Sequence, residues 1–161
     1  WPVDMAGKRV LKAKPKIYIA DAAIRNAVLM DDSLLTDPVE MGKIVETAVY
    51  KHVAAFYYQK ATSVGYFRGG KKNKEIDIVA DYHNAGNILI EVKYREGAPI
   101  PDDDAIAELC AEASAAIVVT KSASDFGVHN TKSGKDMLRI PAFAFLYLLG
   151  HAEKNGYKGI D

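Results

Sequence analysis

Two neighbouring segments in the middle of the chain alternate between apolar and polar residues, with the two-residue period of β-strands. They are Glu75–Tyr82 and Asn87–Tyr94, and Asn84-Ala85-Gly86 between them is a turn signal. We therefore expect an antiparallel hairpin. One face is expected to be apolar and to carry Ile76, Ile78, Ala80, Ile88, Ile90 and Val92. The other face is expected to carry Glu75, Asp77, Val79, Leu89, Glu91 and Lys93.

A helical pattern precedes this hairpin. Asp37, Pro38 and Glu40 are typical of an N-cap, a first helical residue and the third position of a capping box. The helix is expected to run to about Tyr58. Its apolar stripe contains Val45, Val49, Val53, Phe56 and Tyr57. Glu46 lies in or at the edge of this stripe, where a carboxylate is out of place unless it reaches solvent or pairs with a lysine.

The remaining elements complete a mixed α/β pattern. Expected strands are Ile17–Ile19, Ser63–Arg68, Ala116–Thr120 and Met137–Ile140. Expected helices are Ala22–Leu29, Asp103–Ala115 and Ala142–His151, and Asp31–Asp37, Glu96–Asp104 and Ser122–Lys135 are expected loops. The order of strand, helix and strand around Asp103–Ala115 implies a parallel pair within one sheet. The predicted fold class is therefore α/β, with an α+β mixed sheet that is antiparallel first and parallel later.

The composition is typical of a globular domain and does not favour a membrane or disulfide-rich protein. The 161 residues are 49% apolar and 26% charged, which suits one globular domain. The formal net charge is zero, whereas a strong unaided nucleic-acid binder usually carries a basic excess. A single cysteine, Cys110, excludes an internal disulfide and favours a cytoplasmic location. No apolar run is long enough to span a bilayer, no signal-peptide pattern is present, and the four histidines have no zinc-ligand spacing.

Asp77, Glu91 and Lys93 are the candidate chemical residues. Two carboxylates on one face repel each other, and a divalent cation removes that conflict. Mg²⁺ prefers hard oxygen ligands, which the side chains of Asp77 and Glu91 and the Val92 backbone carbonyl could supply. Lys93 could orient a water molecule or offset phosphate charge. The alternative is a cross-strand salt bridge on a solvated face, which contributes little.

With Glu46 added, the set resembles the PD-(D/E)xK nuclease superfamily in its RecB-like arrangement. Further blocks occur in the same order in a prokaryotic family of AAA-type ATPases that ends in a nuclease-like domain. The blocks are K-I-Y-I-A-D-A-A-I-R-N-A-V-L (Lys16–Leu29), V-E-T-A-V-Y (Val45–Tyr50), E-I-D-I-V (Glu75–Val79), I-E-V-K-Y (Ile90–Tyr94) and V-V-T-K (Val118–Lys121). This resemblance implies a restriction-endonuclease-like core with flanking helices at residues 16–161, after a basic tail or linker at residues 1–15.

The chain also departs from these families. Ile76 replaces the proline of the superfamily name, and Ala23 replaces a glycine that is frequent in the first block. No Q-x-x-x-Y element is present, so RecB-type exonuclease machinery is not indicated. No G-x-x-x-x-G-K-[ST] motif occurs, so the ATPase module would lie in another part of the parent chain.

The resemblance implies a DNA nuclease that depends on Mg²⁺ or Mn²⁺. Its catalytic residues would be Glu46, Asp77, Glu91 and Lys93, with Asp77, Glu91 and the Val92 carbonyl as metal ligands. Tyr50 and Tyr94 could support the site. A basic loop could track the DNA backbone through Arg68, Lys71, Lys72 and Lys74.

The same resemblance implies several partners. One is DNA, and another is the AAA-type ATPase and winged-helix portion of the same parent chain. No membrane is expected as a partner. The domain could also form a homodimer. The alternative function is a catalytically inactive module that binds DNA or protein for the ATPase.

Overall fold

The computed structural model describes residues 1–12, 14–30, 36–57, 61–69, 74–82 and 86–155. These residues form a seven-stranded sheet with the order β1-β2-β3-β4-β5-β7-β6. The strands are β1 (Pro2–Val3), β2 (Ala61–Gly69), β3 (Lys74–Tyr82), β4 (Gly86–Lys93), β5 (Ala115–Thr120), β6 (Gly127–Asn130) and β7 (Asp136–Pro141). The helices are α1 (Ala22–Leu29), α2 (Pro38–Tyr57), α3 (Ala105–Leu109) and α4 (Ala142–Asn155), and two short 3₁₀ turns are η2 (Cys110–Glu112) and η3 (Ala123–Asp125).

The sheet is mixed, as the sequence predicts. Strands β2, β3 and β4 form an antiparallel meander, whereas β4, β5 and β7 are parallel to one another. The strand β6 pairs antiparallel with β7 at one edge, and β1 pairs parallel with β2 at the other. The chain therefore has the predicted α/β class. The parallel strands follow from the α3 crossover and from the return of the chain to β7.

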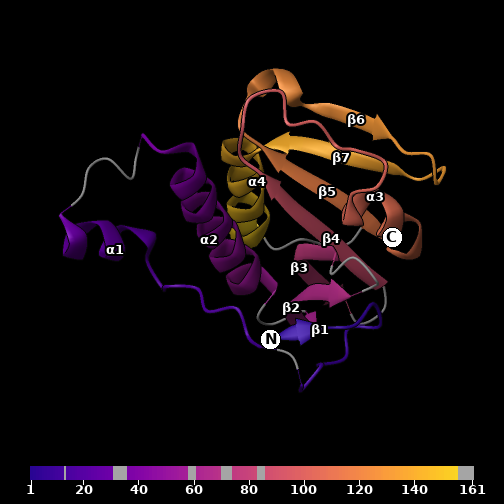
Figure 1. Cartoon of the computed structure of the whole chain (residues 1–161), viewed down its shortest axis with the longest axis horizontal. Helices are drawn as coiled ribbons and strands as arrows, with labels where there is room; N and C mark the ends of the chain where they lie inside the picture. The colour runs from indigo at the N-terminus through magenta and orange to yellow at the C-terminus, as the bar shows by residue number, and fades with distance from the viewer. Residues whose placement is uncertain (13, 31–35, 58–60, 70–73, 83–85, 156–161) are drawn as a thin grey trace.

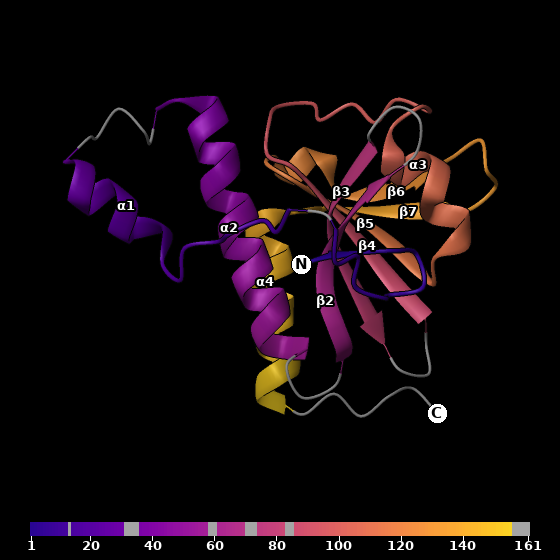
Figure 2. The same cartoon turned by 60° about the horizontal axis from the view of Figure 1, so that its bottom comes forward.

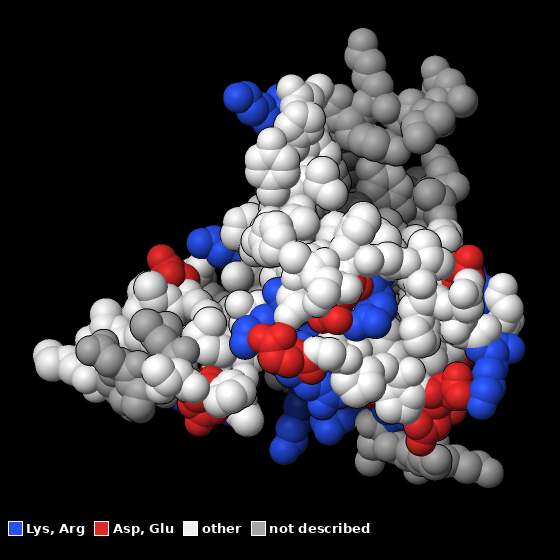
Figure 3. Space-filling view, turned by 90° about the horizontal axis from the view of Figure 1, so that it is seen from above, with Lys and Arg blue, Asp and Glu red and all other residues white. Residues whose placement is uncertain are grey.

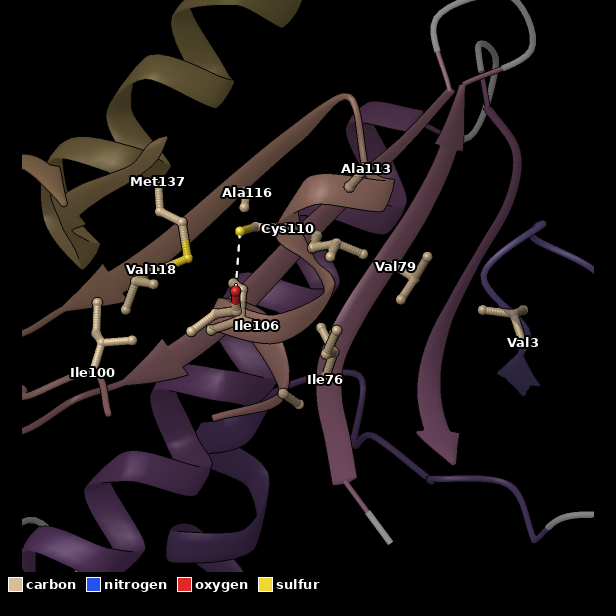
Figure 4. Packing of buried hydrophobic residues seen from close by; sticks show 13 residues of the cluster. Val3, Ile76, Val79, Ile100, Ile106, Cys110, Ala113, Ala116, Val118 and Met137 are labelled. Atoms are coloured by element: carbon tan, nitrogen blue, oxygen red, sulfur yellow. Dashed lines mark hydrogen bonds between the residues drawn. The ribbon is translucent and has the colours of Figure 1, made fainter. Parts of the chain in front are cut away.

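Helices cover the sheet on both faces. Figure 1 and Figure 2 show α2 and α4 side by side against one face, with α3 on the opposite face. The α2–α4 face is packed by Val49, Val53, Ile78, Ala80, Ile90, Val119, Ile140, Ala142 and Phe145. The α3 face is packed by a second set that includes Ile76, Val79, Leu89, Ile106, Cys110, Val118 and Met137 (Figure 4). Cys110 is fully buried there.

A β-bulge in β3 changes the predicted facing of one residue. Gly65 of β2 pairs with Val79, but Phe67, two residues later, pairs with Ile76, three residues earlier on β3. The extra residue on β3 places Ile76 with Val79 in the α3-side cluster, while Ile78 packs on the α2 side. The prediction that Ile76 shares a face with Ile78 is therefore wrong. Bulges re-aim side chains, and this one spans Asp77.

Four other elements differ from the sequence prediction. The segment Ile17–Ile19 is not a strand, and both isoleucines are exposed. The predicted loop Ser122–Lys135 contains η3 and β6, whose residues are polar or exposed and therefore lack the apolar run of a buried strand. The predicted helix Asp103–Ala115 is shorter and ends as a 3₁₀ turn. Strand β1 is not predicted, because two residues are too few to show a period.

Among the described residues, no helix has the length and hydropathy needed to cross a membrane.

The start of α2 is capped as predicted. Oδ1 of Asp37 accepts hydrogen bonds from the backbone nitrogens of Val39 (2.8 Å) and Glu40 (3.3 Å). The Glu40 side chain pairs with Arg25 of α1 and with Lys43 of its own helix, so it acts as a link between helices. Helix α2 also carries Glu46, one of the predicted site residues.

Replacing Asp37 by alanine is expected to lower the free energy of unfolding by about 1 kcal/mol, because two backbone donors lose their acceptor. Urea unfolding of the wild type and the variant measures the difference. Glu153→Ala, at an exposed position near the end of α4, is a suitable control and should change stability by less than about 0.5 kcal/mol. Equal effects of the two substitutions would show that the Asp37 cap contributes nothing.

Candidate functional site

The candidate site lies where β3 and β4 separate. Their ladder runs from the pair Ile78–Ile90 to the pair Tyr82–Gly86, and Asp77 lies just beyond its end. Beyond that end, hydrogen bonds between side chains and the backbone take the place of the backbone hydrogen bonds of the ladder. Oδ2 of Asp77 accepts a hydrogen bond from the Val92 backbone nitrogen at 2.9 Å, and the Asp77 nitrogen donates to Oε2 of Glu91 at 3.4 Å. The Glu91 carboxylate therefore contacts the Asp77 backbone, and the Asp77 carboxylate contacts the backbone of Val92, the residue after Glu91.

Lys93 extends this contact toward α3. Its ammonium lies 3.4 Å from Oε1 of Glu91 and 2.9 Å from Oδ2 of Asp104, the residue that precedes α3. The side chains of Asp77, Glu91 and Lys93 are only 15%, 16% and 12% exposed. A surface salt bridge would be far more exposed, so the alternative of a solvated cross-strand pair does not describe these residues.

Glu46 reaches the site through a lysine. The Lys16 ammonium lies 3.1 Å from Oε1 of Glu46 and 3.2 Å from Oδ1 of Asp77, and it also pairs with Glu75. Glu46 therefore points toward β3 and is mostly buried, as its position at the edge of the helical stripe suggests. The contacts form a continuous series from Glu46 through Lys16, Asp77 and Glu91 to Lys93.

Two tyrosines hold the Glu46 end of the site. The Tyr18 hydroxyl donates to Oε1 of Glu46 at 2.9 Å. Its ring stacks on Tyr50 of α2, with centroids 4.0 Å apart and planes 13° apart. Tyr50 thus contacts the site indirectly, by supporting Tyr18. Tyr94 packs among apolar residues on the α2 side and lines a cavity of about 430 Å³ with Thr36, Pro38, Met41, Arg95, Glu96 and Lys121.

Crowded charges shift the pKa values of these groups. Burial and the neighbouring charge of Asp77 raise the pKa of Glu91 to about 8, and burial with the charge of Glu46 raises the pKa of Asp77. Burial alone would lower the pKa of Lys93, but its hydrogen bond to Asp104 and the charge of Glu91 raise it. Lys93 is therefore a charged donor at neutral pH, which is unlike a general base. The carboxylates would gain from a nearby cation.

The donor chemistry suits a hard divalent cation, whereas the present spacing does not. Asp77 and Glu91 supply carboxylate oxygens, and Mg²⁺ prefers such ligands. In the part of the chain that the structure describes, no three histidine, cysteine, aspartate or glutamate side chains are close enough together to bind a metal ion. The ammonium of Lys16 donates hydrogen bonds to both Glu46 and Asp77, so it already occupies oxygens that a cation would need. Rearrangement of Lys16 would therefore have to accompany metal binding.

The four residues predicted to bind DNA have different surroundings. Lys74 donates to the Asp103 carbonyl at 2.6 Å and pairs with Glu108, so its charge is directed to α3. Arg68 is more exposed and lies 3.5 Å from Glu75. Lys71 and Lys72 lie outside the described residues. On the face seen in Figure 3, lysine and arginine side chains lie beside aspartate and glutamate side chains.

Three residues of this site were not assigned a role by sequence reasoning. Lys16 and Tyr18 lie in the K-I-Y-I-A-D block, whose signal is the family resemblance, and Asp104 lies where an expected loop meets an expected helix. The Lys16 and Tyr18 pair alternates on an extended segment with exposed Ile17 between them. That alternation is the one signal that could have placed their polar ends on the same side.

The family can now be assigned. A model of a domain of unknown function, DUF4143, matches residues 41–143. The chain belongs to the DUF4143 family. The matched region of this DUF4143 domain runs from the first turns of α2 to the start of α4, and it contains Glu46, Asp77, Glu91 and Lys93. Lys16 and Tyr18 precede it. No match was found among curated proteins or among solved structures.

Proposed function

We propose that this DUF4143 domain is a metal-dependent nuclease of the PD-(D/E)xK type that hydrolyses DNA phosphodiester bonds. The observation that carries the proposal is the buried contact of Asp77 and Glu91 at the end of the β3–β4 ladder, with Lys93 beside them. Like charges that are buried together raise the free energy of folding unless a cation or proton offsets them. Buried titratable groups with shifted pKa values are frequent at functional sites.

Each residue has a separate role in this proposal. Asp77 and Glu91 bind the cation, with the Val92 carbonyl as a third oxygen ligand. Their orientation is set by the backbone hydrogen bonds that β3 and β4 exchange with these carboxylates. Glu46, held by Tyr18, positions Asp77 through the lysine between them or a water molecule in its place. Bound Mg²⁺ would lower the pKa of a water molecule and offset the charge of the scissile phosphate.

Lys93 acts through its charge. Its pKa is raised by Asp104 and Glu91, so the ammonium stays protonated and can donate a hydrogen bond to a phosphate oxygen. Asp104 holds the ammonium from the α3 side and limits its rotation. A fixed charge aimed at the developing negative charge stabilises the transition state more than the ground state.

DNA affinity would come mainly from outside this domain. The formal net charge is zero, and Lys74 is directed to α3. The proposed arrangement is therefore a nuclease domain attached to an AAA-type ATPase that brings it to DNA. Cleavage of labelled single- and double-stranded DNA with Mg²⁺ or Mn²⁺, measured with the domain in its full-length chain, tests the proposal. Failure to cut either substrate with either metal would overturn it.

Asp77→Asn is expected to abolish metal-induced stabilisation. A ligand that binds only the folded state raises the melting temperature, and loss of one carboxylate ligand removes most of that gain. Thermal unfolding with and without Mn²⁺ measures the shift in both proteins. The variant without metal should keep the wild-type fold, because asparagine retains an oxygen that can accept the hydrogen bond of the Val92 nitrogen. Equal shifts in the two proteins would show that Mn²⁺ binds elsewhere.

A second candidate function is an inactive interaction module for the ATPase. Helix α1 favours it, because it has no buried residue and exposes Ile24, Val28 and Leu29. Figure 2 shows that α1 projects away from the sheet. Exposed apolar side chains on one helix are typical of a protein interface. The cleavage assay separates the two candidates, since an interaction module has no metal-dependent activity.

A further inference from the structure

The Lys16 ammonium touches carboxylates from both α2 and β3. A lysine ammonium has three donors, and three carboxylates accept from or pair with this one: Glu46, Glu75 and Asp77. Its charge is thus fully used inside the candidate site. Lys16 belongs to a segment outside the helices and strands, and it lies in sequence well before α2 and β3, which it joins.

Several further contacts hold this segment across the site. The Tyr66 hydroxyl donates to the Lys14 carbonyl, and the Lys16 ammonium lies 5.3 Å from the centre of the Tyr66 ring. Tyr18 is held by Glu46 and by stacking on Tyr50. We call the segment Lys14–Tyr18 the strap. Ile17 in its middle is almost wholly exposed, so the strap is attached by its polar and aromatic side chains and not by an apolar core.

We propose that the strap is a built-in gate of the metal site, in which the Lys16 ammonium holds the Asp77 carboxylate until a divalent cation displaces it. The inference rests on the proposed function and adds its regulation. A site with the strap in place is closed, and a site with Lys16 withdrawn is open to metal.

Charge and space make the two cations mutually exclusive. Mg²⁺ ligates oxygen at about 2.0–2.1 Å, whereas the ammonium holds Oδ1 of Asp77 at 3.2 Å. Both would need the same Asp77 oxygen, and two positive groups within a few ångströms repel strongly in a partly buried site. Removal of Lys16 leaves Glu46, Glu75 and Asp77 without their shared counter-charge. A divalent cation bound at Asp77 would then supply the missing positive charge.

Lys16→Met tests the proposal, because methionine keeps an unbranched stem and removes the charge. Mn²⁺ alone is the probe, and calorimetric titration measures its dissociation constant in the full chain. The variant is expected to bind Mn²⁺ about tenfold more tightly, since the closed state no longer competes with the metal. Lys12→Met, at an exposed lysine of the same N-terminal region, is the matched control and should leave the dissociation constant unchanged.

The outcomes separate the gate from the metal site itself. Equal affinity in wild type and Lys16→Met, or weaker binding by the variant, overturns the gate and leaves the nuclease proposal standing. Binding by neither protein overturns both. Binding by the variant alone supports the gate in its strongest form. The added substitution Asp77→Asn in the Lys16→Met protein should abolish binding, and persistent binding there would also overturn the gate.

Proteolysis of the wild-type chain gives a second measurement that needs no variant. A lysine-specific protease must take the Lys16 ammonium into its own pocket, so it can cut the Lys16–Ile17 bond only when the strap is released. Mn²⁺ is expected to speed this cleavage several-fold, with cleavage after Lys12 as the internal control. An unchanged or slower cut after Lys16 in saturating Mn²⁺ would overturn the gate.

Discussion

Replacing Lys93 by methionine is expected to lower the rate of DNA cleavage by about 10²–10³-fold while Mn²⁺ binding persists. The ammonium of Lys93 is oriented by Asp104 and Glu91, and its pKa is raised, so it presents a fixed positive charge. A charge that acts on the developing transition state changes kcat more than KM. Single-turnover cleavage at saturating Mn²⁺, beside calorimetric titration of Mn²⁺, measures both quantities.

The control for this experiment is Lys154→Met, at an exposed position in the last turn of α4, which should cleave like the wild type. Lys93→Arg should recover only part of the activity, because guanidinium is planar and wider than ammonium. If Lys93→Met cleaves at the wild-type rate, its charge has no catalytic role. If the variant loses Mn²⁺ binding as well, Lys93 serves the metal ligands and not the chemical step.

Ile90→Ala is expected to lower the free energy of unfolding by about 2–5 kcal/mol. Ile90 is 1% exposed on the central strand β4, where it packs between the sheet and helices α2 and α4. Truncation removes apolar contacts and leaves a cavity that neighbours on a paired strand cannot fill. Urea unfolding monitored by circular dichroism measures the loss.

Ile24→Ala provides the same change of side chain at an exposed site. Ile24 is 52% exposed on α1, so its truncation should alter stability by less than about 0.5 kcal/mol. Ile90 also neighbours Glu91, and a cavity there would loosen the strand that positions the site. A loss at Ile90 as small as that at Ile24 would contradict the packing of β4 between two layers.

Part of the candidate site could be predicted from the sequence, because some of its residues stand out from their own neighbours. Glu46 interrupts an apolar stripe, and Asp77, Glu91 and Lys93 interrupt strands, so each is visible as a charge in an apolar pattern. Lys16 and Tyr18 gave no such signal. They lie in an extended segment without strand pairing, and their partners are 28 to 61 residues away along the chain. Contacts at that separation leave no local period.

The bulge in β3 illustrates the same limit. Alternation along Glu75–Tyr82 correctly predicts a strand, because its period reflects burial on two faces. The extra residue between Ile76 and Val79 shows only in the pairing with β2, where Gly65 and Phe67 set the register. A single sequence carries no record of that register. The facing of Ile76 therefore could not be predicted, and the reach of Asp77 toward both Val92 and Lys16 could not be predicted either.

The sequence by itself determined the α/β class, the positions of α1, α2 and the β3–β4 hairpin, and the charged residues that stand out from their apolar neighbours. Those features depend on local periodicity and capping, which neighbouring residues encode. Only the tertiary structure decided that β4 lies between β3 and β5, that the carboxylates meet at the end of a ladder, and that a lysine stands among them. These features depend on which distant segments share a layer, and the free energy of burying both sheet faces selects that arrangement.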